Sequence, residues 1–175
     1  MSDLVRRQVG RLRRLVEDLL EISRLDAANV QIDWQDCDLG QVVRASLEPY
    51  ADRVEIDTGV AGIVRGEPRR IERIVTNLVR NALAHGAPPV RVVAAGHRLT
   101  VTDSGTGYPP ELLTQGPRRF ATFSPSQGSG LGLTIATKHA EALGGELTLG
   151  NDTAGGACAR VTLRRASSDA PTPKT

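Results

Sequence analysis

The chain has 175 residues, of which 39% are apolar, 24% are charged and only 3% are aromatic. This length holds one core of ordinary size plus an appendage, or two small domains, and the composition is that of a globular protein with an aliphatic core. The formal net charge of +2 does not indicate a polyanionic partner, and so few aromatic residues argue against binding nucleic acid by base stacking.

The cysteines and the apolar runs exclude further classes. Cys37 and Cys158 lie far apart, with no Cys or His at metal-ligand spacing, so we expect neither a disulfide framework nor a zinc site. No apolar run is long enough to cross a bilayer, and no signal peptide is recognisable. We therefore expect the chain as given to be cytoplasmic and to contact a membrane only through segments that would lie upstream.

Residues 3–28 are predicted to form one long helix. The residues of its apolar stripe are spaced by four and three positions along the chain: Val5, Val9, Leu12, Val16 and Leu19. A single helix cannot bury such a stripe, so its partner is either missing or supplied by a second copy of the chain. The arginines near its start favour a solvated helix face over a DNA-binding surface.

The remaining elements are predicted in the order helix, hairpin, helix, hairpin, long loop, helix, hairpin. Asp38 and Gln41 resemble a capping box at the start of the first of these helices. The predicted pieces are a short helix ending near 49, strands 53–57 and 62–66, a helix 68–84, strands 90–95 and 99–103, a loop 104–129, a helix 131–143, and strands 146–149 and 159–163. The pattern predicts an α/β two-layer sandwich, in which a mixed, mainly antiparallel sheet carries helices on one face.

Four segments carry polar chemistry, and each alone is a weak signal. Asn77 and Asn81 are four residues apart and share one helix face, where they either bond to loops and water or help to hold a metal or phosphate. Asp103 ends a strand and opens D-S-G-T-G, which is either an ordinary turn or a site where a carboxylate accepts from a purine amine. In the loop with R-R-F-A-T-F, the arginines either pair with a terminal phosphate or stay solvated beside a small hydrophobic contact. The glycines of G-S-G-L-G-L at 128–133 either bind phosphate through backbone N–H groups or make a tight turn.

Together and in this order, the segments resemble the ATP-binding catalytic domain of two-component sensor histidine kinases. R-R-I-E-R-I-V-T-N-L-V-R-N-A-L-A-H resembles the asparagine box, D-S-G-T-G the first glycine box, R-R-F-A-T-F the phenylalanine box and G-S-G-L-G-L the second glycine box. The opening helix resembles the second helix of the dimerisation and phosphotransfer hairpin. The resemblance implies a GHKL (Bergerat-type) ATP-binding fold with ATP and Mg²⁺ as ligands.

The resemblance also implies roles for individual residues. Asn81 would help to bind Mg²⁺, with Asn77 beside it, and Asp103 would accept the adenine amine. Arg119 would neutralise the γ-phosphate from a lid formed by 108–127. The glycine-box residues would wall the adenine or cradle the triphosphate: Gly105, Gly107, Gly128, Ser129, Gly130, Leu131 and Gly132.

The chain departs from the family pattern at three places. Ala84 stands where the family commonly has Lys or Arg, so His85 or Arg80 would have to supply that phosphate contact. Pro117 stands at the usual first Phe of the phenylalanine box, and the lid is shorter than usual. None of the three histidines lies in a phosphoacceptor setting, so we expect a piece cut within the hairpin that binds ATP but does not phosphorylate itself.

These implications give a domain division and a set of partners. The predicted parts are the partial hairpin (1–28), a linker (29–37), the catalytic domain (38–166) and a disordered tail (167–175). The expected partners are ATP, a response regulator and, in the full-length protein, a second copy. That protein could sit in the inner membrane with this domain in the cytoplasm.

Two alternatives stay open at this point. The first is another ATPase or kinase of the same fold, such as an anti-sigma-factor kinase. The second is a non-catalytic dimerisation module with decayed boxes.

Overall fold

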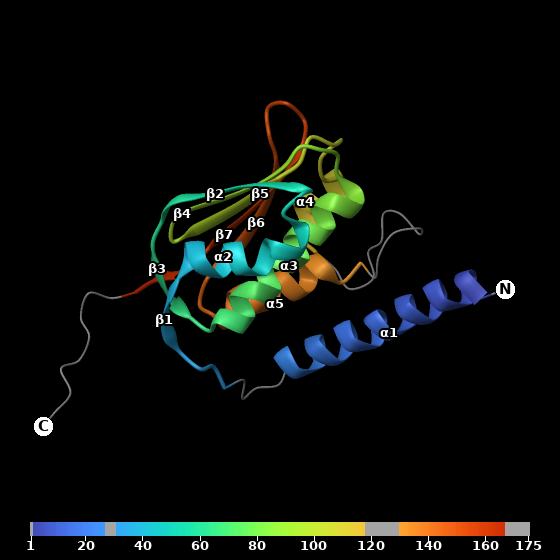
Figure 1. The fold of residues 1–175 in the computed structure, drawn as a ribbon, viewed down its shortest axis with the longest axis horizontal. Helices are drawn as coiled ribbons and strands as arrows, with labels where there is room; N and C mark the ends of the chain where they lie inside the picture. The colour runs from blue at the N-terminus through green and yellow to red at the C-terminus, as the bar shows by residue number, and fades with distance from the viewer. Residues whose placement is uncertain (1, 27–30, 118–129, 167–175) are drawn as a thin grey trace, which may run out of the picture.

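The computed structural model describes residues 2–26, 31–117 and 130–166, and its main layer is a five-stranded sheet in the order β2-β4-β5-β7-β6. β2 and β4 run parallel, and the other neighbours are antiparallel. The strands are β2 (Val54–Ala61), β4 (Val90–Gly96), β5 (Arg98–Thr102), β6 (Glu146–Asn151) and β7 (Ala157–Thr162). The helices α2 (Leu39–Leu47), α3 (Pro68–His85) and α5 (Gly132–Ala142) lie together on one face of this sheet (Figure 1).

The core lies between that face and those helices. The inward positions of β4 alternate with exposed ones, as a half-buried strand requires, and α3 turns an apolar stripe toward them. Five of these side chains are fully or almost fully buried: Ile71, Ile74, Leu78, Val90 and Val92. The predicted two-layer sandwich is therefore confirmed, and α3 spans the predicted helix to within one residue.

The predicted hairpin between 53–57 and 62–66 is wrong. β3 (Ile63–Gly66) pairs instead with β1 (Gln35–Asp38) and β8 (Arg164–Arg165) in a second, three-stranded sheet. Only Gly62 separates β2 from β3, which is too short for a hairpin turn. Gly62 N donates to the Gly96 carbonyl at 2.8 Å, and a Cβ at 62 would fall 3.1 Å from that oxygen. The chain therefore passes from one sheet to the next through a glycine that approaches β4 closely.

Other boundaries differ in smaller ways. The expected linker 29–37 contains most of β1, and the expected loop 104–129 contains the short helix α4 (Pro110–Gln115). A 3-10 turn, η1 (Glu48–Tyr50), follows α2. Asp38 caps α2 as predicted, because its carboxylate accepts from Gln41 N at 2.9 Å.

The opening helix α1 (Ser2–Leu25) lies outside the sandwich, alongside α5 (Figure 1). Its predicted stripe is largely exposed in this chain: Val5 by 52%, Val9 by 60%, Leu12 by 61% and Val16 by 47%. Leu19 packs instead against a small cluster around Ile22. The described residues thus leave most of the stripe exposed, and what would cover it stays a prediction.

Candidate functional site

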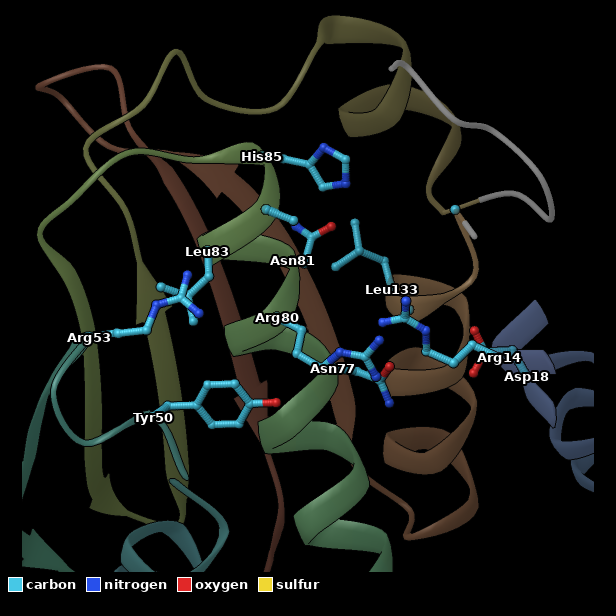
Figure 2. A pocket seen from close by; sticks show the side chains of 13 residues that line it. Arg14, Asp18, Tyr50, Arg53, Asn77, Arg80, Asn81, Leu83, His85 and Leu133 are labelled. Atoms are coloured by element: carbon cyan, nitrogen blue, oxygen red, sulfur yellow. The ribbon is translucent and has the colours of Figure 1, made fainter. Parts of the chain in front are cut away.

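A cavity of about 430 Å³ opens beside the C-terminal half of α3 (Figure 2). Its walls come from α3, from the start of α5, from the turn after α2, and from α1. The lining residues are Arg14, Asp18, Tyr50, Arg53, Asn77, Arg80, Asn81, Leu83, Ala84, His85, Gly130, Gly132 and Leu133. The cavity therefore gathers the predicted asparagine helix and the described end of the second glycine motif.

Asn77 and Asn81 lie one turn apart on the cavity side of α3 (Figure 2). Asn77 is 6% exposed, and its Nδ2 donates back to the Arg73 carbonyl at 2.7 Å. Its Oδ1 lies 3.4 Å from the place where a Cβ on Gly132 would stand. A Cβ at residue 132 would therefore be in ordinary van der Waals contact with Asn77, so Asn77 lies directly beside the glycine turn at the start of α5.

Asn81 has a different partner, Tyr108. A hydrogen bond joins the Asn81 side chain to the Tyr108 phenol group. Burial raises the pKa of Tyr108 well above its ordinary value, the nearby Asp103 and Cys158 act in the same direction, and the bond from Asn81 acts against them. The phenol is therefore neutral over the physiological range and ties Asn81 to the segment that follows the first glycine motif.

Asp103 is not one of the residues that line the cavity. It packs against Gly86, which directly follows the lining residue His85. It is 6% exposed, and its Oδ1 accepts from Gly105 N at 2.8 Å and from Ala157 N at 3.4 Å. Its carboxylate faces Gly86, the residue that follows α3. Backbone N–H groups therefore hold this carboxylate in place. Its contact with a purine amine stays a prediction.

The glycines of the first motif pack closely. A Cβ on Gly105 would fall 3.0 Å from Asp103 Oδ1. Gly107 has a φ of +81° and a Cβ there would fall 2.6 Å from both Asn151 Cγ and the Gly155 carbonyl oxygen, so only glycine fits. Asn151 accepts from Tyr108 N and donates back to the Tyr108 carbonyl, at 2.7 and 3.0 Å. These contacts fix the turn that carries Tyr108 toward Asn81.

The second glycine motif is only partly described. Gly130 has a φ of +69° and Gly132 opens α5, and both line the cavity. Leu131 between them is fully buried against Ile22 of α1 and Ile135, so its side chain does not line the cavity. Arg119, Gly128 and Ser129, with most of the predicted lid, lie outside the described residues.

Sequence reasoning missed several cavity residues. Tyr50 and Arg53 come from the turn after α2, and Arg14 and Asp18 come from α1. No motif marks any of them, because they reach the cavity only when distant elements pack together. Gly86, which does not line the cavity but packs against Asp103, carried one usable signal, because a glycine directly after a predicted helix commonly marks the end of that helix.

The polar groups that line the cavity are two amides, three guanidinium groups, one carboxylate, one phenol and one imidazole: Asn77, Asn81, Arg14, Arg53, Arg80, Asp18, Tyr50 and His85. Among the described residues, no group of three or more His, Cys, Asp or Glu side chains is placed to hold a metal ion. Asn81 offers a neutral oxygen ligand, the kind that Mg²⁺ accepts while it takes most of its other ligands from phosphates and water. The residues present therefore fit a magnesium ion that arrives with a nucleotide, and not a separate metal centre.

A mixed sheet with helices on one face, and a polar cavity between α3 and α5, defines the class of the protein as a GHKL-type α/β sandwich. Residues 66–167 match the family model described as histidine kinase-, DNA gyrase B-, and HSP90-like ATPase. The chain belongs to this family.

Comparison with individual proteins shows which members of this family the chain is similar to. The chain is 42% identical over 153 residues to the sensor protein CseC of Streptomyces avermitilis, covering 86% of the chain and 31% of that protein. It is 38% identical over 178 residues to the signal transduction histidine-protein kinase AfsQ2 of Streptomyces coelicolor, covering 96% of the chain and 33% of that protein. The chain thus spans about a third of the length of these relatives, and the predicted resemblance to sensor histidine kinases is confirmed.

Solved structures of sensor histidine kinases also match this chain. Full-length ShkA in complex with AMPPNP matches with a TM-score of 0.78 and 26% identity, over 95% of this chain and 38% of that one. The mycobacterial sensor histidine kinase MprB matches with a TM-score of 0.62 and 27% identity, over 76% of this chain and 99% of that one. No helix among residues 2–26, 31–117 and 130–166 combines the length and apolarity needed to span a membrane.

Proposed function

We propose that this chain is the ATP-binding catalytic domain of a two-component sensor histidine kinase. The whole protein would transfer the γ-phosphate of ATP to a histidine on a hairpin only partly present here, for relay to a response regulator. One observation carries this proposal: Asn77 and Asn81 on α3 line the same cavity as Gly130 and Gly132. The rival of a non-catalytic module with decayed boxes loses its support, because the asparagine and glycine motifs still converge.

The cavity suits a nucleoside triphosphate in size and charge. Its volume of about 430 Å³ lies in the range of small-molecule sites, roughly 300–1,000 Å³. Gly132 begins α5, so the first N–H groups of that helix are available to phosphate oxygens. Arg80 and His85 line the same space from α3, and they are the residues that would replace the basic side chain missing at Ala84.

Mg²⁺ would be held by Asn81 together with the phosphates. When bound, it would neutralise charge on the phosphates as the γ-phosphoryl group leaves. Asn77 would keep the glycine turn in place, and the cavity residues would orient the triphosphate and limit its exposure to water. No residue of this chain is assigned as the proton acceptor, because none of its three histidines is proposed as the phosphoacceptor.

Calorimetry with a non-hydrolysable ATP analogue and Mg²⁺ tests this proposal. We expect saturable binding, weakened at least about tenfold in Asn81→Ala, because a ligand to the metal–phosphate end is lost. Thr76→Ala is the matched control, since Thr76 lies on the same helix, is not a lining residue of the cavity, and hydrogen-bonds through its hydroxyl to carbonyls of its own helix. No binding by the unaltered chain at millimolar nucleotide would overturn the proposal.

A further inference from the structure

The opening helix forms part of the cavity wall, although it lies outside the α/β sandwich. Arg14 and Asp18, one turn apart on α1, line the same space as Asn77 and Arg80 on α3. The match to the ATPase family begins only at residue 66. A charged group from a separate helix is therefore added to the site that the family fold builds.

Arg14 points its charge into this space. In Figure 2 its side chain extends from α1 toward α3 and α5, and Arg80 extends toward the same region from α3. Arg14 Nε donates to the Gly10 carbonyl of its own helix at 3.2 Å, and among the described residues its guanidinium forms no ion pair. Two guanidinium groups that face one cavity repel each other, and an anion between them would remove that cost.

Glu21, two turns after Arg14, fastens α1 to the sandwich. Its carboxylate accepts from Arg73 Nε of α3 at 2.8 Å and pairs with Arg73 through a second, shorter contact. Its Oε1 also lies 2.7 Å from His139 Nε2 of α5, and His139 Nδ1 lies 3.4 Å from Arg70 Nη1. His139 is 5% exposed and the Glu21 side chain is 20% exposed, whereas the Arg73 side chain is 40% exposed, so this group of side chains is partly shielded from water.

Apolar packing completes the attachment next to the glycine motif. Ile22, which follows Glu21, is 1% exposed and packs with Leu131 and Ile135 of the α5 region. Lys138 Nζ lies 2.5 Å from Asp26 Oδ1 at the end of α1. The C-terminal part of α1 is therefore fixed against α3 and α5. Because Arg14 belongs to the same continuous helix, these contacts also set where Arg14 lies.

We propose that Arg14 is a phosphate-contacting residue of the cavity and that Glu21 is the positioning residue that holds it there. This inference rests on the proposed function, because it takes the ligand to be a nucleoside polyphosphate. The proposed contact from Arg14 adds α1 to the nucleotide site. The position of α1 would then influence the affinity for the nucleotide. Asp18, beside Arg14, offsets part of the positive charge, so the expected effect is moderate.

Nucleotide titration of single variants tests the role of Arg14. We expect Arg14→Ala to weaken ATP binding by about three- to tenfold, the scale of one partly exposed charge pair, with a smaller loss for ADP and none for adenosine. Arg14→Lys should retain part of the affinity. Arg13→Ala is the control, because the Arg13 side chain is 80% exposed and pairs with Glu17 of its own helix. Equal losses for ATP and adenosine, or no loss for ATP, would overturn the role of Arg14.

A double-mutant cycle tests the role of Glu21. Glu21→Gln should weaken ATP binding by a similar factor, and the double variant should bind no worse than the weaker single variant, because both changes remove the same contact. Circular dichroism on each variant checks that the fold is kept. Additive losses would show that Glu21 does not act through Arg14. If the unaltered chain binds no ATP, the proposed function fails. If Arg14→Ala binds ATP as well as the unaltered chain does, only this inference fails.

Discussion

Gly86 and Asp103 are packed so closely that a Cβ on residue 86 would fall 2.3 Å from the Asp103 Cγ and 2.5 Å from its Oδ2. The contact joins the end of the asparagine helix α3 to the carboxylate that opens the first glycine motif. Two motifs that lie far apart in the sequence are thereby held in one arrangement. The glycine is needed here for space and not for its backbone angles, because its φ of −91° suits any residue.

Gly86→Ala should therefore displace a buried carboxylate. We expect a loss of about 1–3 kcal/mol in the free energy of unfolding, the usual scale for overpacking, together with weaker ATP binding. Chemical denaturation and calorimetry measure the two effects. Gly150→Ala is the matched control, because a Cβ on Gly150 meets nothing within 4 Å. Equal stability of the two variants would contradict the prediction.

Asp103→Asn tests the predicted purine contact with little change in shape. An amide at 103 keeps one acceptor for Gly105 N but brings an N–H group to the site where the carboxylate would accept from the adenine amine. We expect ATP affinity to fall by about tenfold or more, since a buried hydrogen bond to a charged group is lost. ITP, which lacks the amine, should bind the unaltered chain poorly. An unchanged ATP titration in the variant would remove Asp103 from the site.

Tyr108 should make the stability of the fold fall at alkaline pH. Because its pKa is raised in the folded state, the folded chain keeps a proton that the unfolded chain loses above about pH 10. Its contribution is therefore complete below that pH and is lost as the pH rises further. In Tyr108→Phe this loss should disappear, while the free energy of unfolding at neutral pH drops by about 0.5–1.5 kcal/mol with the bond to Asn81. Urea unfolding at several pH values measures the free energy of unfolding of the unaltered chain and of Tyr108→Phe. If the two free energies fall in parallel as the pH rises above about 10, the prediction is contradicted.

How much the sequence predicts depends on the range of the interactions involved. α3 was predicted nearly to the residue, because its start at Pro68 and its apolar period are local signals. The pairing of β3 with β1 and β8 was missed, because strand partners are set by tertiary packing, and the neighbouring β2 looked like a nearer partner.

The residues of the cavity also differ in whether the sequence predicts them. Asn77, Asn81, Gly130 and Gly132 were predicted through motifs and lie on one cavity. Arg14 and Tyr50 carry no motif, and they reach the cavity only because α1 and the turn after α2 dock beside it. Position in space, and not residue type, identifies them.

Acid should release α1 from the sandwich. Burial acts to raise the pKa of Glu21, but hydrogen bonds from His139 and Arg73 and the charge of those groups outweigh it, so the pKa falls from 4.5 to about 2. The attachment is then complete above pH 4.5 and is lost as the pH falls toward 2. The stability difference between the unaltered chain and Glu21→Gln should be constant above pH 5 and shrink toward pH 2. A difference that does not change with pH would contradict this assignment.

The chain should bind ATP without labelling itself. Its three histidines are His85, His97 and His139. His139 is 5% exposed and engaged with Glu21, and His97 accepts from Arg165 Nε at 3.1 Å on the second sheet's side of the fold. His85 lines the cavity at the end of α3, and the proposed function gives it a phosphate contact and not the role of phosphoacceptor. Incubation with γ-labelled ATP and Mg²⁺ should therefore leave no acid-labile phosphate on the protein. Stable label that disappears in His85→Gln would show instead that the chain carries its own acceptor.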